Sequence, residues 1–230
     1  MIIIGHRGAM GYEPENTLLS FQKAIDLQVD MIEFDVHHCQ SGELVVIHDE
    51  KVNRTTDGQG FVAKKTLVEL KELDAGKGEK IPTLEEALDL IDKQVKVNIE
   101  LKGKNTAEAT LKIIQKYIGS SLARNEKNWT YNDFLVSSFD SPQLEILRDL
   151  DKDIDLAVAI DADPLDYIEF SQRLKAYSIH PIVKRTDKKF VELAHQNNLK
   201  VFVWTVDPKE VQRMKEIGVD GIFMNYPDKI

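Results

Sequence analysis

Two pairs of charged residues, each with one residue between its members, carry the strongest chemical signal in this sequence. Glu33 and Asp35 form the first pair, and Glu100 and Lys102 form the second. On a β-strand, residues two apart point to the same face. If both faces line one cleft, three carboxylates converge there, and like charges in a partly buried cleft need a compensating charge. A divalent cation supplies it, and carboxylate oxygens favour Mg²⁺ or Ca²⁺ over zinc. Solvent-exposed strand faces are the alternative interpretation.

Two histidines stand where they could serve such a cleft. His6 directly follows the apolar run Ile2–Ile4, and His48 follows the run Leu44–Ile47. The second run comes after a Ser-Gly turn, so we expect it to fold back antiparallel and to return His48 toward Glu33. Imidazoles titrate near neutral pH, and two of them beside a metal can act as general acid and general base.

Further residues could contact a substrate. Arg7 and Lys102 have the charge to hold a phosphate, although either could instead pair with nearby carboxylates. Trp204 and Phe139 could line an apolar substrate wall, although aromatic residues on strands more often lie in the core. Residues expected to have structural roles only are His37, His38, His180, His195 and the inert thiol Cys39.

Short apolar runs alternate along the chain with longer amphipathic stretches. The expected strands are Ile2–Ile4, Met31–Val36, Val95–Leu101, Phe134–Phe139, Ile154–Ile160, Ala176–Ile179, Lys200–Val206 and Val219–Met224. Expected helices span Glu15–Leu27, Ala107–Tyr117, Gln143–Leu150, Pro164–Leu174, Lys189–Asn197 and Lys209–Ile217, and one more begins at Thr83, where Thr83 and Glu86 form a capping box.

Eight strands separated by helices predict parallel strands with helical crossovers, as in a (β/α)8 TIM barrel. A doubly wound open sheet is the competing architecture, but no glycine-rich phosphate loop follows the first strand. We expect one α/β domain over residues 1–230, with a small insertion after the second strand at about residues 49–80. Chemistry in such barrels takes place at the carboxyl ends of the strands, where the candidate residues fall.

Bulk properties narrow the class of protein. The chain has 230 residues, a formal net charge of -9 and a single cysteine, which excludes an internal disulfide. An acidic chain is poorly suited to nucleic acids or anionic membranes. The apolar start at Met1 is too short for a signal peptide, and the chain has no run of about 18 apolar residues. We therefore expect a cytoplasmic enzyme without stable membrane insertion, of undetermined oligomeric state.

An ordered series of motifs resembles the glycerophosphodiester phosphodiesterase family. The series comprises His6-Arg7-Gly8, Pro14-Glu15-Asn16-Thr17, Glu33-Phe34-Asp35-Val36, His48-Asp49, Arg54-Thr55-Thr56, Leu73-Asp74-Ala75-Gly76, Ile81-Pro82-Thr83-Leu84-Glu85-Glu86, Asn98-Ile99-Glu100-Leu101-Lys102, Ser137-Ser138-Phe139, Trp204-Thr205-Val206 and Asp220-Gly221-Ile222. The resemblance implies a TIM barrel that hydrolyses glycerophosphodiesters to glycerol 3-phosphate and an alcohol. It also implies a divalent cation on Glu33, Asp35 and Glu100, an acid–base pair of His6 and His48, and phosphate binding by Arg7 and Lys102.

Two departures from the family pattern lie late in the chain. Asp207 stands where the family usually has Asn, and Met224-Asn225 replaces a common Thr-Asp. Both are expected to lie away from the metal and to affect substrate shape more than activity. Two other functions compete with the implied one. A phospholipase would need an apolar or basic rim, which this chain lacks, and a purely ligand-binding barrel would not need all seven catalytic, metal and phosphate residues.

Overall fold

The computed structural model describes residues 1–119 and 129–230 and contains a closed barrel of eight parallel strands. The barrel strands are β1 (Ile2–His6), β2 (Met31–His38), β4 (Lys96–Leu101), β5 (Phe134–Ser138), β6 (Asp155–Ile160), β7 (Ser178–Pro181), β8 (Lys200–Val203) and β9 (Gly221–Met224). Strand β1 pairs in parallel with both β2 and β9, and these pairings close the ring. The predicted (β/α)8 barrel is therefore confirmed, and the open doubly wound sheet was wrong.

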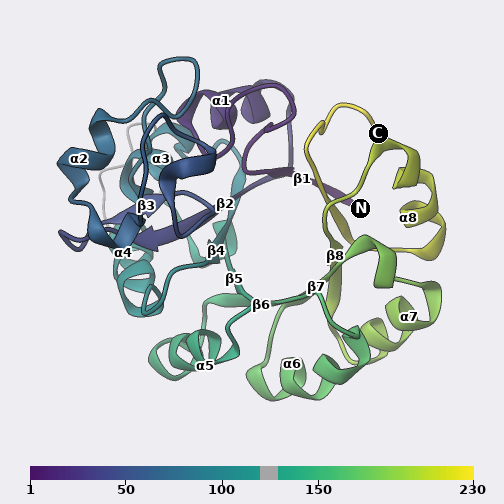
Figure 1. Ribbon diagram of the computed structural model, residues 1–230. Helices are drawn as coiled ribbons and strands as arrows, with labels where there is room; N and C mark the ends of the chain where they lie inside the picture. Colours follow the sequence, from purple (N-terminus) through teal and green to yellow (C-terminus); the bar gives the residue numbers. More distant parts are fainter. Residues whose placement is uncertain (120–128) are drawn as a thin grey trace.

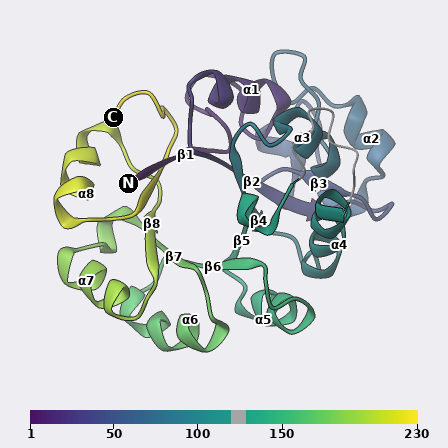
Figure 2. The ribbon, with the colours of Figure 1, turned by 180° about the vertical axis from the view of Figure 1, so that it is seen from behind.

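Helices surround the ring, as both views along the barrel show (Figures 1 and 2). They are α1 (Leu18–Asp26), α2 (Leu67–Glu72), α3 (Leu84–Ile91), α4 (Ala107–Gly119), α5 (Ser141–Leu150), α6 (Ile168–Leu174), α7 (Lys188–Gln196) and α8 (Val211–Ile217). The predicted capping box is present, since Thr83 accepts from the amide of Glu86 and Glu86 accepts from the amide of Thr83. Helix α1 begins three residues later than predicted because Thr17 is its N-cap.

The polypeptide between β2 and α3 leaves the barrel pattern. Strand β3 (Leu44–Val46) pairs antiparallel with the end of β2, as predicted. Beyond it, residues 49–80 hold two short 3-10 helices, Val52–Arg54 and Val62–Lys64, and helix α2, which the weak periodicity of the segment did not predict. The buried residues of this whole segment pack with Cys39, Val45 and Ile47 in a small cluster separate from the main core. The segment lies outside β2 and next to α3 in Figure 1.

The core has two layers. Most buried apolar side chains lie between the strands and the helices. A smaller cluster fills the barrel interior, and includes Ile4, Met31, Leu135, Ala157, Phe202 and Phe223. Since side chains alternate along a strand, Met31 at the start of β2 places Glu33 and Asp35 on the same interior face, nearer the carboxyl end. Across residues 1–119 and 129–230, no helix has both the length and the apolar character needed to cross a bilayer.

Candidate active site

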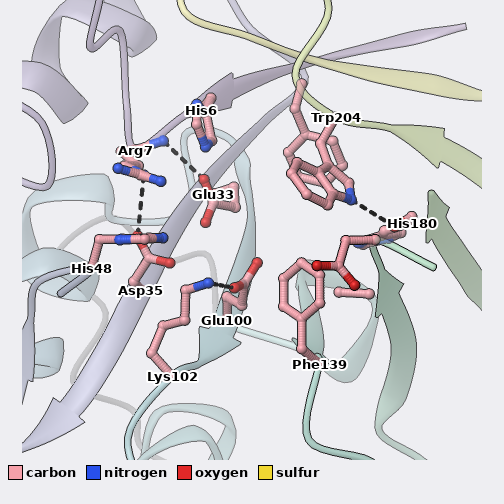
Figure 3. Close-up of a pocket in the computed structure, with 13 residues that line it drawn as sticks. His6, Arg7, Glu33, Asp35, His48, Glu100, Lys102, Phe139, His180 and Trp204 are labelled. Atoms are coloured by element: carbon pink, nitrogen blue, oxygen red, sulfur yellow. Dashed lines mark hydrogen bonds and ion pairs between the residues drawn. The ribbon is translucent and has the colours of Figure 1, made fainter. Parts of the chain in front are cut away.

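A cavity of about 430 Å³ opens at the carboxyl end of the barrel strands, within the range of small-molecule sites. All nine residues predicted from the sequence as catalytic, metal-binding or substrate-binding line it, and Figure 3 shows them converging from different strands. The lining residues are His6, Arg7, Glu33, Asp35, His48, Glu100, Lys102, Phe139, Ala159, Asp161, His180, Trp204 and Phe223.

Three carboxylates meet at one side of this cavity. Glu33 and Asp35 come from β2, and Glu100 comes from β4, where it is the register partner of Asp35. Oxygen atoms of the three lie within 4.8 Å of one another, and Glu33 and Asp35 are buried. Burial and the neighbouring carboxylate of Asp35 raise the pKa of Glu100 to about 7, and the same causes raise the pKa of Glu33 well above its usual range. The cluster therefore holds more negative charge than its protein surroundings compensate.

The donor set of this cluster fits a divalent cation. The backbone amide of Arg7 donates to Glu33 Oε2 over 2.9 Å, and the Asn16 side chain donates to Asp35 Oδ2 over 2.9 Å. The other oxygen of Asp35, Oδ1, is buried and has no hydrogen-bond partner among the described residues. A buried carboxylate oxygen without a partner is costly, and a hard cation is the partner that oxygen ligands of this kind bind.

His6 lies at the carboxyl end of β1, and its side chain contacts Asn225, one of the departures from the family pattern. Its Nδ1 is 2.7 Å from the side-chain oxygen of Asn225, so the ring donates to the amide oxygen. Asn225 was expected to lie away from the metal and to affect substrate shape. Pairing of β1 with β9 places Gly5 beside Met224 and His6 next to Asn225, so Asn225 contacts a candidate catalytic residue. Burial, reinforced by the charge of Arg7, lowers the pKa of His6 to about 4.

His48 reaches the cavity from the loop after β3, and its partner is a carboxylate. Its Nδ1 lies 2.6 Å from Asp49 Oδ1, and His37 Nε2 lies 3.0 Å from the His48 carbonyl oxygen. Hydrogen bonds from Arg54, at 2.7 and 2.9 Å, hold the pKa of Asp49 well below its usual range. Asp49 is thus an anion that orients the His48 ring, while His37 fixes the His48 backbone.

Two cations lie beside the carboxylates. Arg7 has a left-handed backbone conformation, with φ of 50°, and its guanidinium lies 3.5 Å from Asp35 and 2.7 Å from Glu15. The Lys102 ammonium lies 2.6 Å from Glu100. Both cations are therefore paired with carboxylates, which was one of the two interpretations, and both line the cavity where a phosphate could approach them.

The opposite side of the cavity is largely aromatic. Phe139 and Trp204 meet edge to face, with ring centroids 5.4 Å apart. The Trp204 indole N–H donates to the carbonyl oxygen of His180 over 2.7 Å, which directs the ring of Trp204 along the cavity (Figure 3). Phe139 is 39% exposed and Trp204 is partly buried, so neither aromatic residue is wholly part of the core.

The side chains given structural roles are all hydrogen-bonded within the protein. His180 is stacked on Phe202 and lies 2.9 Å from the Ser178 hydroxyl, and its pKa is lowered to about 3 by burial. His38 contacts two backbone carbonyl oxygens, and His195 pairs with Asp220 on the surface. Cys39 is buried and donates to Glu43. Of these residues, only His180 lines the cavity.

Several residues that complete the site were not singled out in the sequence. Glu15, Asp49 and Arg54 fall in the family motifs and form one ion network beside His48, but their pairing depends on the fold. Asp161 lines the cavity and directly follows β6, so the rule that located the other strand-end residues could have found it. Asp207 does not line the cavity.

Comparison with known proteins identifies the family. Residues 6–229 match the model of the glycerophosphoryl diester phosphodiesterase family. A glycerophosphodiester phosphodiesterase of Caldanaerobacter subterraneus subsp. tengcongensis is 37% identical over 100% of this chain and 96% of its own length. One from Bacillus subtilis is 31% identical over 99% and 84%.

Solved structures agree with these sequence relatives. A phosphodiesterase of Oleispira antarctica, in complex with the product sn-glycerol-3-phosphate, superposes with a TM-score of 0.90 at 30% identity, covering 100% of this chain and 95% of that one. A glycerophosphodiester phosphodiesterase of Thermotoga maritima gives 0.81 at 27% identity, covering 99% and 96%. The chain therefore belongs to the glycerophosphoryl diester phosphodiesterase family.

Proposed function

We propose that this enzyme hydrolyses glycerophosphodiesters to glycerol 3-phosphate and an alcohol, using one divalent cation and the histidines His6 and His48. The observation that carries the proposal is the convergence of two imidazoles on a cluster of three carboxylates within one cavity of a family member. A family relative with bound sn-glycerol-3-phosphate supports the same product for this chain.

Glu33, Asp35 and Glu100 would hold the cation, since their oxygens lie within 4.8 Å of one another and Asp35 Oδ1 lacks a partner among the described residues. When bound there, Mg²⁺ or Ca²⁺ would neutralise negative charge on the phosphoryl oxygens. Arg7 and Lys102 stand beside this cluster and would donate hydrogen bonds to the same oxygens. Together these groups place the phosphate on the polar side of the cavity.

The histidines transfer the protons. One imidazole removes a proton from the attacking hydroxyl, and the other protonates the alcohol oxygen as its bond to phosphorus breaks. Two nucleophiles are compatible with this arrangement. The neighbouring glycerol hydroxyl can attack phosphorus to give a cyclic phosphate that water then opens, with the advantage of proximity. Alternatively, water attacks directly. Trapping a cyclic glycerophosphate assigns the first route, whereas ¹⁸O from solvent in the product with no detectable cyclic species favours the second.

Product analysis tests the proposed reaction. The metal-supplemented protein should release glycerol 3-phosphate from deacylated glycerophosphodiesters and should leave intact phospholipid dispersions essentially uncleaved. Preferential cleavage of intact lipid would instead establish a phospholipase. Binding of a glycerophosphodiester without any turnover would contradict the enzymatic proposal and favour a ligand-binding barrel.

A further inference from the structure

The segment that follows β9 lies beside the loop between β1 and α1 (Figure 1). Its first residue is Asn225, whose side-chain oxygen receives the hydrogen bond from His6 Nδ1. The Asn225 carbonyl oxygen in turn accepts from the backbone amide of Gly11 over 2.9 Å. The backbone that carries the partner of His6 is therefore attached to the β1–α1 loop.

Two tyrosines and an aspartate extend this attachment. Tyr226 directly follows Asn225, and its ring meets the ring of Tyr12 edge to face, with centroids 5.1 Å apart. The Tyr12 hydroxyl lies 2.8 and 3.0 Å from the two carboxylate oxygens of Asp228, to which it donates. We use the name tyrosine clasp for the set Gly11, Tyr12, Tyr226 and Asp228.

The clasp leaves no room for a side chain at position 11. A Cβ atom on Gly11 would lie 2.5 Å from a ring carbon of Tyr226, far inside van der Waals contact. Glycine permits this close approach of a ring to the backbone. The Tyr226 ring thus packs directly on the loop whose amide holds the Asn225 carbonyl oxygen, and this packing limits how far Asn225 can shift relative to β1.

The clasp lies outside the cavity. None of its four residues is among those that line the cavity, so it can influence the reaction only through residues that do. All four are partly or fully exposed, so replacing one of these side chains should leave the barrel folded. Of the cavity residues, His6 is linked to the clasp through a single intermediate, Asn225.

We propose that the tyrosine clasp positions His6 for proton transfer by holding Asn225 in place. The inference rests on the proposed function, in which His6 is one of the two acid–base residues, and it makes Tyr12 and Tyr226 positioning residues. While Asn225 is held, the neutral His6 ring keeps its proton on Nδ1 and leaves Nε2 free to accept one. Once the clasp is broken, Asn225 can move away and the ring gains freedom of both rotation and tautomer.

A double-mutant cycle on kcat tests this route. Tyr226→Ala should lower kcat by about three- to tenfold with a smaller change in KM, because a displaced imidazole transfers protons less efficiently. Tyr226→Phe keeps the ring and should recover most of the lost rate. In an Asn225→Ala background, Tyr226→Ala should have little further effect, since two changes that act through one contact are not additive. Losses of equal size in both backgrounds would overturn the inference.

The tautomer of His6 gives a second measurement, which a purely stabilising role of the clasp would not change. Long-range ¹H–¹⁵N NMR spectra of the histidine rings report which nitrogen carries the proton. At neutral pH we expect the Nδ1–H form of His6 in the wild type and a mixture of both tautomers in Tyr226→Ala. An unchanged His6 spectrum in Tyr226→Ala would overturn the inference.

Tyr177→Ala is the matched control. Tyr177 also meets another ring edge to face, that of Phe202 at 6.1 Å, but it directly precedes β7 and does not line the cavity. This variant should keep the wild-type kcat and the wild-type His6 spectrum. Absence of turnover in the wild type would overturn the proposed function and this inference with it. Normal wild-type turnover combined with additive losses would overturn the inference alone.

Discussion

His6 and Asn225 are in direct contact although 219 positions separate them in the chain, with Nδ1 of the ring 2.7 Å from the amide oxygen. Closure of the barrel between β1 and β9 creates the contact. Since the amide oxygen can only accept, Nδ1 carries a proton and the neutral ring keeps Nε2 unprotonated. Asn225 thereby fixes both the tautomer and the orientation of His6, whereas His48 has the carboxylate of Asp49 in the equivalent position.

Loss of the amide at position 225 should impair the chemical step. We expect Asn225→Ala to lower kcat by about tenfold or more, in line with other residues that orient a reactive imidazole, with a smaller change in KM. Asn225→Asp restores an acceptor for Nδ1 and should recover much of the rate. It should also move the limb of the pH profile that His6 sets to higher pH, because a carboxylate beside the ring raises the pKa of His6. An unchanged kcat in Asn225→Ala would show that the contact has no positioning role.

Substitution of either proposed acid–base histidine should greatly reduce kcat. His6→Ala and His48→Ala are each expected to lose at least roughly 10²-fold in kcat, since general acid or base catalysis contributes about 10²–10⁴-fold. His195→Gln is the control, because His195 lies on α7 and pairs with Asp220 on the surface. Steady-state measurement of kcat tests this prediction. Near-normal activity in His6→Ala or His48→Ala would show that the substituted histidine is not a general acid or base.

The ion pair between Asp49 and Arg54, next to His48, should affect kcat more than KM. Asp49 orients the His48 ring and is itself held by two hydrogen bonds from Arg54. Asp49→Ala should reduce kcat by about tenfold with little change in KM. Arg54→Met should have a smaller effect because Asp49 stays in place. If Asp49→Ala raised KM at constant kcat, Asp49 would be a substrate contact instead.

Metal affinity should depend on pH in a defined direction. Ligating carboxylates must be ionised, and the pKa of Glu100 is raised to about 7 while that of Glu33 is also raised. Protons therefore compete with the cation below about pH 7, and affinity should fall by about tenfold per pH unit for each proton displaced. Calorimetric titration of the metal-free protein with Mg²⁺ or Ca²⁺ between pH 5 and pH 8 measures this. Affinity that is constant across the range would contradict the carboxylate site.

Local pattern explains which parts of the site could be read from the sequence. Glu33 and Asp35 were found because a strand repeats every two residues, and Glu100 because it ends the next barrel strand. The position of His48 followed from the turn before β3. Each of these inferences uses only neighbouring residues and the rule that barrel strands share one carboxyl end.

The remaining features depend on contacts between distant segments. The pairing of Asn225 with His6 requires the register across the closing strands, which no local spacing encodes. Arg54 reaches both Glu15 and Asp49 only because the fold brings the insertion next to the segment that precedes α1. Helix α2 is an exception, since Thr66 and Glu69 form a capping box that marks its start in the sequence.

The most direct test of the central claim is the release of glycerol 3-phosphate by metal-stripped protein, measured without metal and after addition of Mg²⁺ or Ca²⁺. The three-carboxylate cluster, with Asp35 Oδ1 unpartnered among the described residues, predicts negligible turnover of the stripped protein and recovery with at least one of the two cations. Full turnover in the presence of a chelator, or no turnover with either cation, would contradict the account.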